Sequence, residues 1–461
     1  MSPLPPQPIS PLDGRYRRAV GDLGEHLSEA ALNRARLRVE IEWLLALTDR
    51  RMFGTSALGD GDREALRAFA ADFGQTEIDR LAALEATTRH DVKAVEYLLR
   101  ERLAALGLDR VAELAHFAAT SEDINNLAYA LTIREAVDVV WLPRFRDLLA
   151  EIERWARTER ATPMLAHTHG QPATPTTVGK EFAVTAGRLR RQLARIEAVR
   201  PLGKFSGASG TFSAHAVADP DADWPEISRA FVEGLGIAWN PLTTQIESHD
   251  WQAELFQAIA HAGRILHGFA VDVWTYISMG YLVQVPAEGA TGSSTMPHKV
   301  NPIRFENAEA NLEIAGALLD SLAATLVESR LQRDLTDSTT QRNIGVALGH
   351  SLLALDNLLR GLGEIAVDRA RLDADLGANW EVLAEAIQTV IRAEVTAGRS
   401  SITDPYALLK ELTRGRRVGA AELADFVAGL DLSDGAKARL SALTPGAYTG
   451  LADRLVDRLD A

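Results

Sequence analysis

The chain has 461 residues, which is too long for one compact core and predicts about two or three domains. Apolar residues make up 46% of it and charged residues 24%, the balance of an ordinary globular protein. Its 49 basic and 63 acidic residues give a formal charge of 49 − 63 = −14, which disfavours nucleic acid and anionic membranes as partners. The absence of cysteine excludes disulfides, thiolate catalysis and thiolate-held zinc or iron–sulfur sites.

The first residues, MSPLPPQPISPLDGRY, are rich in proline and predict an extended start. They lack the basic start and apolar core of a signal peptide. No apolar run reaches the roughly 18 residues that a membrane-spanning helix needs. We therefore expect a cytoplasmic protein without membrane contact.

Beyond this start the apolar spacing is helical, and strand-like alternation is nearly absent. Residues 1 to about 113 carry shorter helical patterns, interrupted by FGTSALGDGD and LGLDR. Four long patterns follow, in which apolar residues recur at three- and four-residue steps: 178–200, 250–280, 305–328 and 343–366.

Long helices with wide apolar stripes have to pack side by side, which predicts an all-α protein built on a bundle. Thirty helical residues span about 45 Å at 1.5 Å per residue. We divide the chain into an N-terminal helical domain (1–113), a central long-helix domain (114–365) and a C-terminal domain of short helices (366–461). The width of the stripes also favours association with further chains.

Six polar segments interrupt the helical pattern: DGRY (13–16), TTRHDVKAVEY (87–97), ATSEDINN (119–126), THGQPATP (168–175), GSSTMPHKVNP (292–302) and RLQRDLTDSTTQRN (330–343). Each can be a solvated loop or a helix cap. In the third, Thr120 or Ser121 is a candidate helix N-cap, with an acidic residue in the first turn.

Three interpretations apply to His167-Thr168-His169 in the fourth segment. Two histidines at this spacing can ligate a metal ion, but no further ligand cluster lies nearby and metal sites usually take three or four. A structural histidine at a turn is the second interpretation. The third is general acid–base catalysis, since the reference pKa of histidine lies near 6.5.

The fifth segment begins with Gly292, Ser293 and Ser294 but matches neither a serine-nucleophile elbow nor a phosphate loop. Lys299 and Asn301 follow on the same loop, just before a predicted helix. The free N–H groups at a helix start suit a carboxylate or a developing oxyanion. This set favours removal of a proton next to a carboxylate over acyl transfer.

GSSTMPHKVNPIRFEN resembles the signature loop of the fumarase/aspartase superfamily, whose members eliminate fumarate from succinyl compounds. Within it, TTRHDVKAVEY, TSEDINN, THGQPATP, WNPLTTQIESHD and QRDLTDSTTQRN resemble the adenylosuccinate lyase family in its longer bacterial type. The match runs from SPLDGRY to LTPGAY, nearly the whole chain. It implies a three-domain all-α fold, a homotetramer with sites built from three chains, and no cofactor or metal.

The resemblance also implies the reaction: adenylosuccinate is split to AMP and fumarate, and the succinyl-carboxamide ribotide of the purine pathway is split in the same way. It makes Ser293 the general base, His169 the general acid, and Lys299 and Asn301 the residues that stabilise the aci-carboxylate intermediate. It assigns the succinyl carboxylates to Thr120, Ser121, Thr168 and Gln245, the phosphate and ribose to Arg15, Tyr16, Arg333, Ser338 and Arg342, and the nucleotide side to His90 and Asp91. The implied substrate-binding set is completed by Arg89, Met296, Val300, Asn307, Thr339, Thr340 and Gln341.

Some positions depart from the family pattern or leave an alternative. Arg89 stands where relatives carry Asn, and His167 stands where an Arg is expected. Ser294 is the alternative base, although the place in the motif favours Ser293. The rival functions are another lyase of the superfamily, such as argininosuccinate lyase or fumarase, and a non-enzymatic structural bundle. HDVKAVE and RDLTDST disfavour the former, and intact acid, base and lysine positions disfavour the latter.

Overall fold

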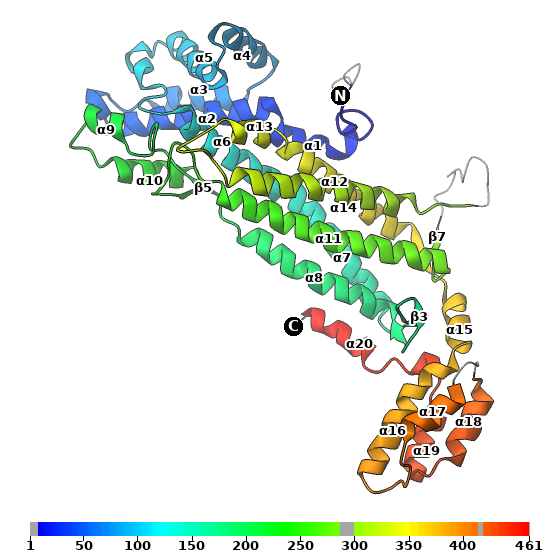
Figure 1. The fold of residues 1–461 in the computed structure, drawn as a ribbon. Helices are drawn as coiled ribbons and strands as arrows, with labels where there is room; N and C mark the ends of the chain where they lie inside the picture. The colour runs from blue at the N-terminus through cyan, green and yellow to red at the C-terminus, as the bar shows by residue number, and fades with distance from the viewer. Residues whose placement is uncertain (1–7, 286–298, 414–417, 461) are drawn as a thin grey trace. The chain divides into compact units, whose positions relative to one another are not determined.

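The computed structural model describes residues 8–285, 299–413 and 418–460 (Figure 1). Its contacts group into two compact units. The first unit consists of Met1–Arg146, Gln192–Arg264 and Ala310–Asp356, and the second of Asp147–Arg191, Ile265–Glu309 and Asn357–Ala461. The three-part division at residues 113 and 365 stays a prediction.

Helix dominates both units, and the four long helices predicted from the apolar spacing are confirmed. Five long helices contribute residues to both units: α7 (Leu142–Thr158), α8 (Val178–Ala198), α11 (Asp250–Met279), α12 (Ile303–Leu326) and α14 (Ile344–Gly363). Among the described residues, no helix combines the length and apolar character needed to cross a bilayer.

The described part of the first unit contains twelve further helices, most of them short. Their bounds are α1 (Arg17–Leu27), α2 (Glu29–Asp49), η1 (Met52–Gly54), α3 (Asp60–Ala71), α4 (Gln75–Thr88), α5 (Asp91–Ala105), η2 (Asp109–Leu114), α6 (Ser121–Glu135), η3 (Ala136–Trp141), α9 (Ser213–Ala218), α10 (Trp224–Gly234) and α13 (Thr336–Gln341). A short parallel pair joins β5 (Leu202–Gly203) to β6 (Ala238–Trp239). Helix α2 packs against α3, α5 and α6, so it forms the centre of this part (Figure 1).

Buried side chains join the long helices within the first unit. The indole N–H of Trp141 donates to Ser351 Oγ on α14 at 2.9 Å. His350 Nδ1 lies 2.8 Å from Asn311 Oδ1, which links α14 to α12. Paired polar groups of this kind specify one register between neighbouring helices because an unpaired buried polar atom is costly.

Aromatic packing joins the long helices within the second unit. The ring of Phe182 on α8 lies 5.3 Å from the ring of Trp155 on α7 and 5.3 Å from that of Phe269 on α11, measured between centroids. A β-carbon at Gly361 on α14 would lie 2.9 Å from Phe305 on α12, so this glycine lets the two helices approach closely.

The rest of the second unit comprises three antiparallel strand pairs and the C-terminal helices. The pairs join β1 (Pro163–Met164) to β4 (Thr176–Thr177), β2 (His167–Thr168) to β3 (Gln171–Pro172), and β7 (Leu282–Gln284) to β8 (Ile365–Val367). The helices are α15 (Arg369–Gly377), η4 (Trp380–Leu383), α16 (Ala384–Thr396), α17 (Pro405–Thr413), α18 (Ala420–Gly429), α19 (Asp434–Ser441), η5 (Pro445–Ala447), α20 (Ala452–Leu455) and η6 (Val456–Asp460).

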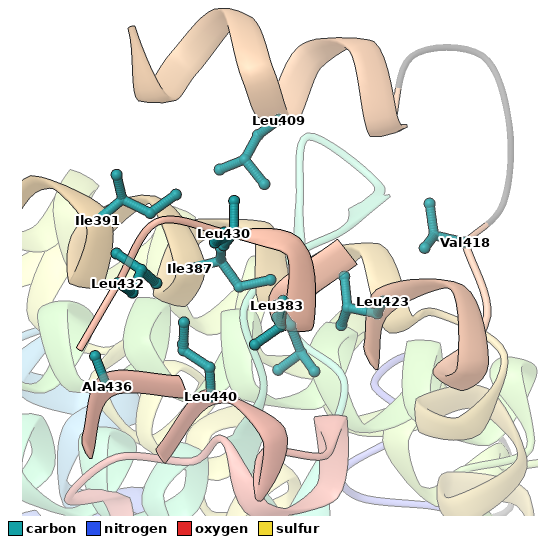
Figure 2. Packing of buried hydrophobic residues seen from close by; sticks show 11 residues of the cluster. Leu383, Ile387, Ile391, Leu409, Val418, Leu423, Leu430, Leu432, Ala436 and Leu440 are labelled. Carbon is teal, nitrogen blue, oxygen red and sulfur yellow. The ribbon is translucent and has the colours of Figure 1, made fainter. Parts of the chain in front are cut away.

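The short helices predicted for the tail surround an apolar cluster of their own (Figure 2). Its centre is Ile387 and Ile391 of α16, which are 1% and 0% exposed. Leu409 of α17, Leu423 of α18 and Leu440 of α19 pack around this centre from the neighbouring helices.

Two glycines of α8 differ sharply in their surroundings. A β-carbon at Gly179 would lie 2.3 Å from the carbonyl oxygen of Ala156 and 2.5 Å from the Cα of Arg160, whereas nothing lies within 4 Å of one at Gly187. The N–H of Gly179 also donates to the carbonyl of Glu159 at 2.9 Å. The end of α7 and the start of α8 therefore touch backbone to backbone.

We predict that Gly179→Ala lowers the melting temperature because the contacting atoms belong to backbone, which cannot move aside cheaply. Gly187→Ala is the matched control, and it should leave the melting temperature unchanged or raise it, since Ala is favoured over Gly in a helix by about 1 kcal/mol. Thermal unfolding followed by circular dichroism checks both. Equal melting temperatures for the two variants would contradict the close contact.

Candidate functional site

The predicted site residues are divided between the two units. The first unit holds Arg15, Tyr16, Arg89, His90, Asp91, Thr120, Ser121, Gln245, Arg333, Ser338, Thr339, Thr340, Gln341 and Arg342. The second holds Thr168, His169, Lys299, Val300, Asn301 and Asn307. Ser293, Ser294 and Met296 lie outside the described residues.

The start of α5 presents His90 and Asp91. His90 is the N-cap, and its Nδ1 accepts the backbone N–H of Lys93 at 3.1 Å. Because Nδ1 accepts, the proton of the neutral ring sits on Nε2, which lies 3.5 Å from Ser121 Oγ. The structure thus brings together predicted site residues from the second and third polar segments.

The carboxylate of Asp91 connects a buried guanidinium to an exposed one. Its Oδ2 accepts from Arg36 Nη2 at 2.9 Å and lies 3.4 Å from Arg342 Nη2. Its Oδ1 accepts the N–H of Val92 at 2.9 Å. Burial by itself would raise the pKa of Asp91, but Arg36, the Val92 N–H and Arg342 together lower it, so the group is a carboxylate at neutral pH.

A second buried carboxylate, Glu122 on α6, lies between Asn125 and Arg333. Its Oε1 accepts from Asn125 Nδ2 at 2.8 Å and lies 2.8 Å from Arg333 Nη2. Burial raises the pKa of Glu122, and Arg333 opposes that rise. Arg333 is therefore the main counter-charge of a carboxylate whose residue is only 2% exposed.

These contacts close into a ring. Arg36 Nε donates to Asn125 Oδ1 at 2.8 Å, which joins the two carboxylate sites. On the other side, Arg333 Nη2 donates to Ser338 Oγ and Arg342 Nη1 to the Ser338 carbonyl, both at 3.1 Å. We call this set the polar ring; it consists of Arg36, Asp91, Arg342, Ser338, Arg333, Glu122 and Asn125.

The turn before α6 is held rigidly beside the polar ring. Asp123, which is 0% exposed, accepts the N–H groups of Thr120, Ser206 and Gly207 at 2.9 to 3.0 Å. Its Oδ1 also lies 2.8 Å from Nζ of the equally buried Lys204. Thr120 is the N-cap, as one interpretation of the segment predicted. The positions of Thr120 and Ser121 thus depend on a fully paired buried charge.

Gln245 lies near Arg333 in the first unit. Both line a cavity of about 430 Å³ together with residues 331–335. The side-chain amide of Gln245 donates one N–H to the carbonyl of Ala208 at 2.9 Å, which leaves its second N–H and its oxygen for a ligand. This amide and the guanidinium of Arg333 suit an anionic ligand, and the carboxylate of Asp334 lines the same cavity.

Other predicted residues of the first unit take varied positions. Arg15 is exposed, with its guanidinium carbon 5.9 Å from the ring centre of Tyr16. Thr340 Oγ1 donates within its own helix to the carbonyl of Thr336 at 2.8 Å, and Thr339 is exposed. Gln341 is only 3% exposed and donates to Gln252 at 3.2 Å, so its amide is already engaged.

Arg89 adopts a left-handed backbone, with φ of 52°, at the C-cap of α4. Gly and Asn take this conformation at lower cost than Arg. The departure from the family's Asn thus falls on a backbone position that favours Asn, while the exposed Arg89 side chain is free to reach a ligand.

In the second unit, His169 occupies the tip of a β-hairpin. Strands β2 and β3 pair through His167 with Pro172 and Thr168 with Gln171, which leaves His169 and Gly170 as the two-residue turn. Their φ values are 55° and 74°, the signature of a type I′ turn. A non-glycine residue with positive φ carries strain of the sort that concentrates at functional sites. The imidazole of His169 is exposed on this tight turn.

Lys299, Val300 and Asn301 are all exposed, and α12 begins at Ile303, directly after the proline that the sequence placed at the helix start. Asn307 is half-buried in the first turns of the same helix. In the described ranges, no group of three or more His, Asp and Glu side chains is arranged to hold a metal ion.

The sequence interpretation missed Arg36, Glu122 and Asn125 of the polar ring. Arg36 lies in helix α2, where charged residues also stand at Arg34 and Arg38 between apolar neighbours. No local signal therefore marks Arg36 as the buried one. Glu122 and Asn125 lie within a quoted motif, but the motif does not say which of its polar residues face inward.

Comparisons with known proteins show which family the chain resembles. The profile described as "Lyase" matches residues 14–315, and that described as "Adenylosuccinate lyase C-terminal" matches residues 329–449. The adenylosuccinate lyases of Escherichia coli (strain K12) and Vibrio cholerae (strain ATCC 39541) are each 47% identical to this chain, and each match covers 98% of both chains. These likenesses extend over every segment of the candidate site.

Solved structures share the fold at lower identity. The 3-carboxy-cis,cis-muconate lactonizing enzyme of Pseudomonas putida aligns with a TM-score of 0.73 at 23% identity, covering 95% of this chain and 96% of that one. A fumarate lyase from Mesorhizobium sp. BNC1 aligns with a TM-score of 0.73 at 20% identity, covering 95% and 97%. The predicted all-α fold of the fumarase/aspartase type is confirmed.

The Glu122–Arg333 pair gives a stability prediction. Arg333→Met should lower the melting temperature, at a cost of about 3 kcal/mol, because it leaves a buried carboxylate without its counter-charge. Adding Glu122→Gln to that variant should recover part of the loss, since the unpaired charge is then gone. Differential scanning calorimetry checks this. A double variant that melts no higher than Arg333→Met would show that the charge on Glu122 is not what matters.

Proposed function

Because this chain belongs to the adenylosuccinate lyase family and carries adenylosuccinate lyase activity, we propose that Ser293 and His169 perform the elimination as base and acid. Ser293, as its alkoxide, removes a proton from the succinyl carbon next to a carboxylate. The C–N bond then breaks, the C=C bond of fumarate forms, and His169 gives a proton to the departing nitrogen. Adenylosuccinate yields AMP, and the succinyl-carboxamide ribotide yields its carboxamide ribotide.

The polar ring with its neighbours is the observation that supports nucleotide binding most directly. It joins Arg333, Ser338 and Arg342 to Asp91, and His90 of the adjoining cap lies within 3.5 Å of Ser121. Planar guanidinium groups suit phosphate and carboxylate oxygens. We assign the phosphate and ribose to these arginines and Ser338, with Arg15 and Tyr16, and the succinyl carboxylates to Thr120, Ser121, Thr168 and Gln245.

Charge development during the reaction determines what the second unit has to supply. After proton removal, negative charge builds on the oxygens of the carboxylate next to the carbanion. Exposed Lys299 and Asn301 offer donors for those oxygens, and they lie directly before the positive end of the α12 dipole. Stabilising charge that appears only in the transition state raises kcat rather than affinity.

We further propose a cytoplasmic homotetramer whose sites combine residues of several chains. One feature supports this. Several long helices expose large apolar side chains, including Val184, Trp274 and Ile314, at 40 to 47%. Such side chains on an apolar stripe are typical of surfaces that another copy covers.

Kinetics of single variants test the catalytic assignment. Ser293→Ala and His169→Gln should each lower kcat for adenylosuccinate by about 10²- to 10⁴-fold, the usual contribution of general acid–base catalysis, while substrate binding is retained. Absorbance follows the reaction, and argininosuccinate serves as the control substrate. Ser294→Ala should retain far more activity than Ser293→Ala. The reverse order would move the base to Ser294.

Mixing two inactive variants tests the shared sites. Ser293→Ala and His169→Gln subunits, dissociated and reassembled together, should regain a fraction of wild-type turnover, because some sites then receive an intact base and an intact acid. Light scattering checks the tetramer. Reassembled mixed tetramers that stay inactive would show that the base and the acid of each site come from the same chain.

A further inference from the structure

We propose that Arg36, which no sequence motif of the site contains, is a positioning residue for nucleotide binding: it holds Asp91 and, through Asn125 and Glu122, Arg333, so that the two outer arginines stay available to a phosphate. The proposal rests on the function given above. It concerns residues of the first unit only, and it assigns Arg36 no contact with substrate.

Arg36 is buried, and each of its guanidinium nitrogens has a hydrogen-bond partner. The residue is 2% exposed. Its Nε donates to Asn125 on α6, its Nη1 to Asn33 on α2 and its Nη2 to Asp91 on α5, at 2.8, 2.8 and 2.9 Å. A planar guanidinium with every nitrogen engaged has a single orientation, so it is a rigid reference point for the groups around it.

Through Asp91, Arg36 limits how strongly Arg342 is held. Arg36 and Arg342 share the same oxygen of Asp91, at 2.9 and 3.4 Å respectively. The buried arginine takes the shorter bond, and Arg342, which is exposed, keeps a longer one. Without Arg36, the full charge of Asp91 would be directed at Arg342, which would then have to leave a strong ion pair before it could bind a phosphate.

Through Asn125 and Glu122, Arg36 also limits how strongly Arg333 is held. Asn125 accepts from Arg36 through its oxygen and donates to Glu122 through its nitrogen, at 2.8 Å in both cases. Glu122 in turn lies 2.8 Å from Arg333. If Arg36 is lost, the amide of Asn125 no longer has a fixed orientation, and Arg333 becomes the only strong partner of a buried carboxylate.

Charge counting leads to the same conclusion. The polar ring contains three guanidinium groups and two carboxylates, or +3 − 2 = +1. Asp337, 3.8 Å from Arg333, and Glu29, 3.7 Å from Arg342, bring the sum to +3 − 4 = −1. Because the whole chain carries −14, loss of one buried positive charge here makes the surroundings of a bound anion still more negative.

The test compares Arg36→Met and Arg36→Lys with Arg38→Ala, which removes an exposed arginine of the same helix that pairs with Glu135 outside the ring. Arg36→Met should raise KM for adenylosuccinate and weaken AMP binding by roughly 10- to 100-fold, with a much smaller change in kcat. Arg36→Lys should recover part of this, and Arg38→Ala should match wild type. Unchanged KM and AMP affinity in a folded Arg36→Met protein would overturn the proposal.

A double-mutant cycle covers the case in which Arg36→Met does not fold. Arg36→Lys is combined with Asp91→Asn, and KM is measured for the four proteins. If Arg36 acts through Asp91, its substitution should matter several-fold less once Asp91 is neutral. Effects on KM that simply multiply, or a lowered melting temperature with KM unchanged, would show a structural role only. Wild-type protein without lyase activity would instead defeat the proposed function.

Discussion

An acidic chain that binds an anionic substrate has to concentrate positive charge in one place. In the proposed site, the polar ring combines three guanidinium groups with two carboxylates, and Asn125 and Ser338 link them. This pairing makes the partly buried position of the charged groups tolerable. The groups nearest to solvent, Arg342 above all, keep the longer contacts, while the deepest group, Arg36, keeps the shorter ones.

The surrounding structure makes this ring rigid by using helix ends. His90 and Thr120 are N-caps, and Asp91 stands in the first helical turn of α5. The caps accept backbone N–H groups that would otherwise be unpaired at these helix ends. Helix N-termini also favour negative charge nearby. The buried Asp123–Lys204 ion pair fixes the start of α6. Helix ends thus define the positions of the side chains more tightly than a flexible loop would.

The second unit uses a different device, a two-residue hairpin turn with positive φ at both positions. The turn holds His169 away from its own strands, where its ring can accept or donate a proton. On such a support the ring of His169, the proposed acid, has a defined position, whereas the described part of the fifth polar segment, from Lys299, leads into the start of a long helix. The two devices suit two tasks, protonation at a fixed point and stabilisation of spreading charge.

The amino-acid sequence predicted the long helices and, through its motifs, the family. The apolar period located four long helices to within a few residues, because burial of one face imposes a 3.6-residue repeat on the residues. The polar motifs carried the resemblance to the family and offered Thr120 as one of two candidate N-caps, while the acid and the arginines that they assign stay predictions. Tertiary structure alone decided that Arg36 faces inward and meets Asp91 and Asn125, 55 and 89 positions away. It also decided that Arg89 and His169 have left-handed backbones. Such contacts depend on how helices pack, and the local pattern carries no record of which polar side chain will find which distant partner.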